Sequence, residues 1–202
     1  EGEKNQENYD KLNRLITFIK DSSDEEFKKE FNNYMNLDAT INYYIMGNIA
    51  CLKDNYNHNM LLITYDGKIW YPTLYDMDVS WGTNWFGEET YKYDEDWTHD
   101  GNTSLLWEKL ERCFKEDINN RYFELRKNEL SEDNLIKEFE QFKKSIPARI
   151  LKLEHDKYNK DVNKTYNGHE IIGIPGEDIS QIKKFIKKRT TYVDKKIESL
   201  VK

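Results

Sequence analysis

The spacing of apolar residues predicts helices in the first fifty positions. Apolar side chains recur at helical spacing over residues 9–19, again through Phe27 and Phe31, and over residues 41–49, as in helices that bury one face. Ser22-Ser23-Asp24 is expected to cap the second helix, and Asp38 the third. The third helix is predicted to end near Lys53, which places Asp54 on the loop that follows.

A β-hairpin is predicted next. Two strand-like runs, residues 60–65 and 69–75, are joined by Asp66-Gly67, which is among the strongest short-range hairpin signals. Pro72 indicates an edge strand or a bulge, because proline has no amide hydrogen to donate. Residues 79–103 follow as an irregular stretch, and a loop of this length is usually functional or mobile.

The C-terminal half is predicted to be helical again. An apolar stripe begins with Leu105 and Leu106, and Ser131-Glu132-Asp133 is expected to cap a long helix that runs through Ile150, with a kink at Pro147. Residues 156–176 are polar and predict a connecting loop before a last helix over residues 179–197. We therefore predict one domain, residues 1–202, of the α+β class but mostly α, with an inserted β-hairpin.

Composition excludes some classes of function. The 202 residues carry a net charge of −7, which argues against nucleic acid as the main partner, because phosphate binding needs a basic surface. The lysines around Arg189 lie in a helical pattern and predict a solvated helix face. No apolar run is long enough for a membrane span. Cys51 and Cys113 lack the spacing of metal ligands, and Cys51 is predicted to be a buried free thiol.

Two interpretations of the tryptophans stay open. All five tryptophans fall between residues 70 and 107. Packing of these rings in the core beneath a long loop is favoured, and a ligand or peptide platform is the alternative.

The candidate chemistry lies on both sides of the hairpin. Asp54 is followed five positions later by Asn59, and Asp76 comes after the second strand. Protein kinases arrange a catalytic base, a metal-binding Asn and a metal-binding Asp in this order. Carboxylate and amide oxygens are the ligands that Mg²⁺ prefers, and Mn²⁺ accepts them too. Asp54 would accept or orient a substrate hydroxyl proton, while Asn59 and Asp76 would hold the metal and, with it, ATP.

The neighbours of these residues add detail and an alternative. Asp78 would share a face with Asp76 if the chain stays extended, as a second metal ligand or a brace. His58 is expected to brace the turn, and a single histidine does not make a zinc site. No glycine-rich phosphate loop is present. The alternative is purely structural, since Asp-Asn turns commonly bond only their local backbone.

Residues 37–82 resemble the spore-coat protein H (CotH) kinase family. Its members have a helix rich in Tyr and Asn, a D-N-type turn with a following Asn, and a hairpin that ends in a W-D-x-D-x-x-[FW]-G-like signature. Here the signature is Y-D-M-D-V-S-W-G over residues 75–82, with Tyr75 in place of the usual Trp. The similarity extends to residues 104–110, to Arg121-Tyr122-Phe123 and to a final helix with Arg189.

The resemblance implies an atypical protein-kinase-like C-lobe and ATP-dependent phosphorylation of serine on protein substrates. By position, Asp54 matches the catalytic-loop Asp, Asn59 the metal-binding Asn, Asp76 the main metal-binding Asp, and Asp78 the acid that accompanies it. The family's nucleotide-binding N-terminal lobe would precede residue 1, so this portion alone is expected to be inactive.

Two other functions stay open beside the kinase. One is a non-catalytic module of a large assembly such as a phage tail or spore coat, which would have an assembly partner instead of a protein substrate. The other is a metal-dependent domain that binds carbohydrate or peptide through the Trp-rich loop. The resemblance implies a spore coat, virion or cell surface as the location rather than the plain cytoplasm.

Overall fold

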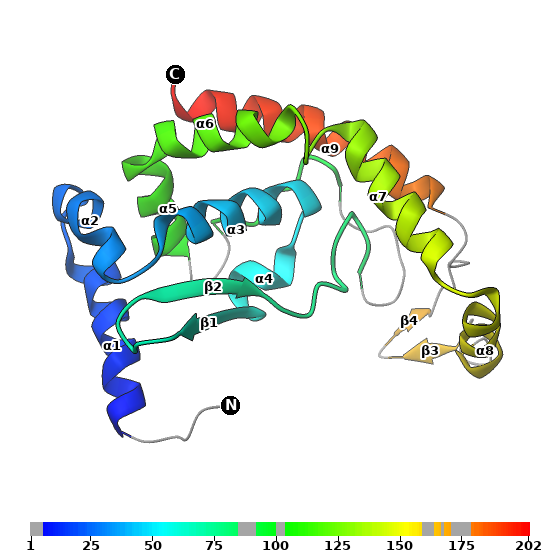
Figure 1. The fold of residues 1–202 in the computed structure, drawn as a ribbon, viewed down its shortest axis with the longest axis horizontal. Helices are drawn as coiled ribbons and strands as arrows, with labels where there is room; N and C mark the ends of the chain where they lie inside the picture. Colours follow the sequence, from blue (N-terminus) through cyan, green and yellow to red (C-terminus); the bar gives the residue numbers. More distant parts are fainter. Residues whose placement is uncertain (1–5, 85–91, 100–103, 159–163, 167, 171–178) are drawn as a thin grey trace.

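The computed structural model describes residues 6–84, 92–99, 104–158, 164–166, 168–170 and 179–202 (Figure 1). The helices are α1 (Gln6–Asp21), α2 (Asp24–Glu30), the 3-10 helix η1 (Phe31–Asn33), α3 (Leu37–Ala50), α4 (Lys53–Asn57), α5 (Ser104–Cys113), α6 (Lys115–Arg126), α7 (Glu132–Ser145), α8 (Ala148–Tyr158) and α9 (Ser180–Leu200). The strands are β1 (Met60–Thr64), β2 (Trp70–Leu74), β3 (Thr165–Tyr166) and β4 (His169–Glu170). The mostly helical α+β class is confirmed, whereas the extent of the domain stays a prediction.

Side-chain caps fix where the first helices begin. Ser23 caps α2 as predicted, because its Oγ accepts a hydrogen bond from Glu26 N. The cap predicted for α3 is wrong. Asn36, not Asp38, has the extended backbone of an N-cap, and its Oδ1 accepts from Ala39 N at 2.8 Å. Asp38 lies in the first turn instead, where its negative charge suits the positive end of the helix dipole.

The predicted hairpin is confirmed, with each strand one residue shorter at the turn and β2 one residue shorter at its outer end as well. β1 and β2 pair antiparallel, with Met60 opposite Leu74 and Leu62 opposite Pro72. Gly67 adopts a φ of 70°, which glycine reaches without strain. The hairpin is tied to the start of α3, because Asn36 N donates to Trp70 O at 3.0 Å. Both strands are edges of this two-stranded sheet, so Pro72 removes no interior ladder bond.

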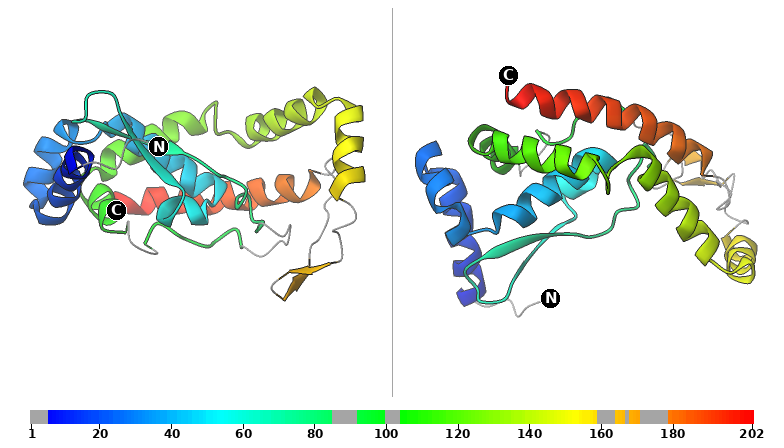
Figure 2. Two further views of the ribbon diagram at one scale, coloured as in Figure 1. Left: turned by 90° about the horizontal axis from the view of Figure 1, so that it is seen from below. Right: turned by 45° about the horizontal axis from the view of Figure 1, so that its top comes forward.

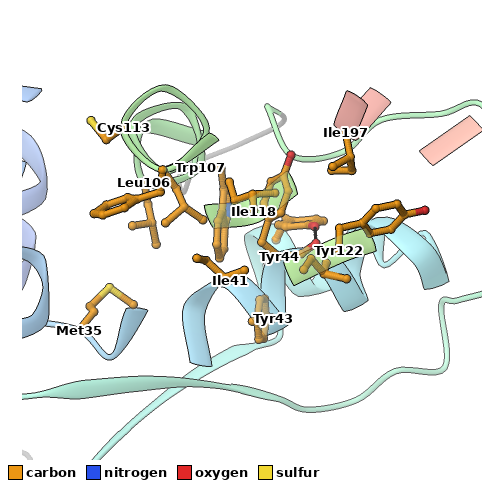
Figure 3. Packing of buried hydrophobic residues seen from close by; sticks show 14 of the residues in the cluster. Met35, Ile41, Tyr43, Tyr44, Leu106, Trp107, Cys113, Ile118, Tyr122 and Ile197 are labelled. Carbon is orange, nitrogen blue, oxygen red and sulfur yellow. Dashed lines mark hydrogen bonds between the residues drawn. The ribbon is translucent and has the colours of Figure 1, made fainter. Parts of the chain in front are cut away.

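The core surrounds α3. Figure 1 shows α3 between the hairpin and the helices α6 and α9, and its buried residues lie on all sides of the helix. Figure 3 shows this packing from close by, with Tyr43 and Tyr44 of α3 near Trp107 of α5. The rings of Tyr43 and Trp107 stack with 5.8 Å between centroids. Such aromatic contacts add to the burial of apolar area that stabilises the fold.

The described tryptophans pack with this core. Trp107 is fully buried, and Trp70, Trp81 and Trp97 are partly buried against the same cluster. Core packing is therefore confirmed for these four, while Trp85 lies outside the described residues. Cys51 and Cys113 are both buried free thiols, as predicted for Cys51.

The single long helix predicted through Ile150 is wrong. The helix ends before Ile146, whose ψ of 117° is extended, because a residue before proline is disfavoured in the helical region. Helix α8 follows, and the side chains of Phe142 and Leu153 are 67% and 62% exposed. The apolar stripe of α7 and α8 is therefore only partly core. Both α8 and the small β3–β4 hairpin lie at the opposite end of the molecule from α1 (Figures 1 and 2).

The C-terminal helix α9 corrects the prediction for Arg189. Lys184, Lys187 and Lys188 are exposed as expected, but Arg189 is 1% exposed. Its guanidinium donates to the carbonyl oxygen of Asn48 at 2.7 Å and to that of Tyr93 at 2.9 Å. Arg189 therefore joins α9 to α3 and to residues 92–99. Within the described residues, no helix is both long and apolar enough to cross a membrane.

Candidate functional site

Asp54 lies in a short helix and not on a loop, which corrects the prediction. Helix α3 ends at Ala50, its C-cap residue Cys51 has a left-handed φ of 56°, and Leu52 N donates to Gly47 O at 3.0 Å. This left-handed ending turns the chain, and α4 starts at Lys53. The carbonyl oxygen of Asp54 accepts from His58 N at 2.7 Å and from Asn59 N at 2.9 Å. Helix α4 thus fixes Asp54 and Asn59 relative to each other through the backbone.

Asp76 lies just beyond the end of β2. Its φ of 52° is left-handed, a conformation that costs a non-glycine residue energy and is held only by its surroundings. The chain is therefore not extended here, and the period-two argument that put Asp76 and Asp78 on one face does not apply. Both side chains are exposed, and Asp78 Oδ1 accepts from Val79 N at 2.9 Å.

Two side-chain amides connect the segments on the two sides of the hairpin. Asn59 Nδ2 donates to the carbonyl oxygen of Asp76 in a long hydrogen bond of 3.4 Å. A second contact comes from Asn55, whose Nδ2 donates to the carbonyl oxygen of Tyr75 at 2.7 Å. The structure therefore brings α4, with Asp54, next to the residues that lead into Asp76. The roles of Asp54, Asn59, Asp76 and Asp78 stay predictions.

Asn55 is the residue that sequence reasoning missed. It is 1% exposed, and the hydroxyl of Tyr43 donates to its carbonyl oxygen at 2.7 Å. The only signal in the sequence is its place in the Asp54-Asn55 pair. The kinase-like pattern assigns chemistry to Asp54 and to Asn59 five residues later, and none to the buried amide between them.

The segment after the two acids is held from several sides. Val79 is buried, and Trp81 N donates to Ala50 O, at the end of α3, at 2.7 Å. Gln181 of α9 donates to Trp81 O at 2.9 Å, and the Trp81 ring packs edge-on against Phe139 of α7. The backbone that carries Asp76 and Asp78 is therefore fixed at both ends, by α4 and by the helices around α3.

A buried ionic cluster joins α9 to α3 and to residues 92–99. Lys196 Nζ bonds Asp96 at 2.7 Å, Asn48 Oδ1 at 2.8 Å and Thr98 Oγ1 at 3.1 Å. Burial pushes the pKa of Asp96 upward, but Lys196 and Thr98 outweigh burial and lower that pKa to about 2. Burial also lowers the pKa of Lys196, although Asp96 and Glu111 oppose this. The Asp96–Lys196 ion pair therefore stabilises the fold less than the pKa of Asp96 alone suggests, because desolvation of the ammonium offsets part of the attraction.

The candidate ligands suit a hard cation that is also bound by water and phosphate oxygens. Among the described residues, no three or more side chains of His, Cys, Asp and Glu gather to hold a metal. Mg²⁺ is usually bound through one or two carboxylates together with waters and phosphate oxygens. Asn59, Asp76 and Asp78 fit that smaller requirement. The Oδ1 of Asn55 has no hydrogen-bond partner within the described part of the chain, but it is buried, so we do not count it among these ligands.

The start of α4 contacts residues 92–99 through Lys53. The ammonium of Lys53, the residue before Asp54, lies 4.4 Å from the centroid of the Trp97 ring, a distance typical of a cation–π contact. This contact holds the start of α4 against residues 92–99.

Comparison with known families gives a match over nearly the whole chain. The sequence model described as CotH kinase protein matches residues 1–193 of the 202. The chain belongs to the CotH kinase family. A search of curated proteins found no match, and a search of solved structures found none either. Family membership makes this a kinase-like domain, and the CotH family in general implies ATP and a divalent metal.

Proposed function

We propose that the protein is a CotH-type kinase in which this domain binds the Mg²⁺ end of ATP and directs its γ-phosphoryl group to a serine hydroxyl of a protein substrate. The observation that carries the proposal is the meeting of α4 with the end of the hairpin. Asn59 contacts the backbone of Asp76, so the two proposed metal-binding residues lie side by side in a chain of the CotH family.

Each residue has a distinct part in the proposed reaction. Asn59, Asp76 and Asp78 would hold the metal through oxygen atoms, and the metal when bound supplies positive charge next to the phosphates. The substrate serine oxygen forms a bond to the γ-phosphorus, and the bond from that phosphorus to the β–γ bridging oxygen breaks, which releases ADP. Asp54 would orient the serine hydroxyl and take its proton.

The decisive test is phosphate transfer by the full-length protein with radiolabelled ATP and either Mg²⁺ or Mn²⁺. We expect Asp76→Ala to abolish transfer and to leave the circular dichroism spectrum unchanged, because Asp76 is exposed and contributes little to the core. Asp66→Ala is the matched control. Asp66 is an acid of the same hairpin, at its far turn, where it accepts from Lys68 N. Undiminished transfer by Asp76→Ala would refute the metal assignment.

The same assay separates the kinase from a module of an assembly. A full-length protein that binds neither metal nor ATP, and transfers no phosphate to any serine-containing protein supplied, would be explained by the assembly role alone.

A further inference from the structure

Asn55 connects the two segments that carry the proposed metal ligands. Its side-chain amide faces two carbonyl groups, that of Tyr75 at 2.7 Å and that of Asn59 at 3.4 Å. Two acceptors on this side fix the orientation of the amide, with Nδ2 toward them and Oδ1 away. One buried side chain therefore bonds the residue before Asp76 and the backbone of Asn59 at the same time.

The bond to Tyr75 lies just beyond the end of the β1–β2 ladder and adds to the long bond from Asn59 Nδ2 to Asp76 O. The β1–β2 ladder stops at the pair of Met60 and Leu74, so the sheet does not fix Tyr75. The next residue, Asp76, is left-handed with a φ of 52°. A strained conformation persists only where neighbouring contacts enforce it, and the Asn55 amide supplies such a contact one residue away.

Asn55 is itself held by the core. The Tyr43 hydroxyl donates to its carbonyl oxygen at 2.7 Å, and the Tyr43 ring stacks on the fully buried Trp107. Burial raises the pKa of Tyr43, so its hydroxyl keeps its proton and remains a donor. The chain of contacts runs from the core, through Tyr43 and Asn55, to the backbone of Tyr75.

We infer that Asn55 is a positioning residue, which rests on the proposed function: its amide fixes where Asp76 lies relative to Asn59 and so sets the geometry for the metal. It does not touch the metal in this role. Residues that orient metal ligands through hydrogen bonds typically change metal affinity about 10- to 100-fold when they are mutated.

The first measurement is Mn²⁺ affinity of the full chain by calorimetry. We expect Asn55→Ala to bind Mn²⁺ about 10- to 100-fold more weakly than the wild type. Asn55→Asp has the same shape, and its ionised carboxylate cannot donate to Tyr75. Added negative charge alone would strengthen cation binding, so weaker binding by Asn55→Asp identifies the lost donor as the cause. Asn119→Ala is the control, because Asn119 also donates its amide to a main-chain carbonyl, that of Ile197, between α6 and α9.

The second measurement needs no metal. The backbone NMR order parameters of Asp76 and Met77 should fall in both Asn55 variants and stay unchanged in Asn119→Ala, because the mobility of this segment is set by the contacts that are lost. If Asn55→Ala fails to fold, Asn55→Asp and Tyr43→Phe carry the test. Tyr43→Phe removes only the hydroxyl that holds Asn55, and we expect the same changes at smaller size.

The outcomes distinguish the two proposals. A wild-type chain that binds no Mn²⁺ overturns the proposed function, and the order parameters of Asp76 and Met77 then still decide whether Asn55 positions this segment. A wild-type chain that binds Mn²⁺, with unchanged affinity and unchanged order parameters in the Asn55 variants, overturns the inference about Asn55 and leaves the proposed function intact.

Discussion

Gly47 makes the sharpest stability prediction, because the substitution Gly47→Ala should reverse its usual sign. Gly47 lies inside α3 and is buried. A Cβ atom there would lie 2.3 Å from the hydroxyl oxygen of Tyr56 and 2.5 Å from its Cζ, far inside van der Waals contact. Tyr56 belongs to α4, two residues after Asp54, so the close approach of α3 and α4 depends on this glycine.

Tyr56 has little room to move away from the added methyl group. Its hydroxyl donates to Tyr44 O at 2.9 Å and accepts from Asn48 Nδ2 at 3.1 Å, and its ring packs edge-on against Trp107. Overpacking of this kind costs about 1–3 kcal/mol, and weakening of the two hydrogen bonds adds about 1 kcal/mol. The gain in helix propensity from Gly to Ala is about 1 kcal/mol. We therefore expect Gly47→Ala to lower the free energy of unfolding by about 2 kcal/mol.

A double-mutant cycle in urea, followed by circular dichroism, checks this reasoning. Tyr56→Leu removes the ring that the methyl group would meet. In that background, Gly47→Ala should raise the free energy of unfolding by about 0.5–1 kcal/mol, as in an unhindered helix. A Gly47→Ala variant that is as stable as the wild type, or the same destabilisation in both backgrounds, would refute the proposed clash.

Two further predictions concern the buried charges. Arg189→Met keeps much of the side-chain volume but leaves the carbonyls of Asn48 and Tyr93 without their donor. We expect the free energy of unfolding, measured in urea, to fall by about 3–5 kcal/mol. A fall of less than about 1 kcal/mol would contradict the anchoring role of Arg189. Asp96 has a folded-state pKa of about 2, below its usual value, so its contribution is present above about pH 4 and is lost as the pH falls through about 2. Because the carboxylate is partly exposed, this contribution is about 1–2 kcal/mol. Across this range, the free energy of unfolding should fall less steeply with decreasing pH in Asp96→Asn than in the wild type. Parallel curves for the two proteins would exclude the contribution.

Local patterns predicted the hairpin and most helix positions well. Asp66-Gly67 located the turn, and Gly67 has the positive φ that this turn needs. The order of acid, amide, hairpin and acid also placed Asn59 beside Asp76. These features depend on residues close in the sequence, so periodicity and turn chemistry suffice to find them.

The errors arise where competing choices are decided by neighbours far along the chain. Asn36 and Asp38 are both good N-caps, and the bond from Asn36 N to Trp70 O, across the hairpin, accompanies the choice of Asn36. Arg189 stands in a run of exposed lysines and is buried because carbonyls of Asn48 and Tyr93 accept from it. No single-sequence periodicity reports such partners.

The conformation of Asp76 favours a functional site over a purely structural role for this segment. A left-handed φ at a non-glycine residue costs about 1–3 kcal/mol, and a buried acceptor without a partner costs about 1–3 kcal/mol. Asp76 has the first feature and Asn55 Oδ1 has the second, and the two residues lie in adjoining segments. Glycine at position 76 would relieve the first cost in a purely structural segment, whereas Asn55 is needed there in any case as the donor to Tyr75 O. A carboxylate that is kept at position 76 at this cost therefore supports the proposed metal-binding role of Asp76.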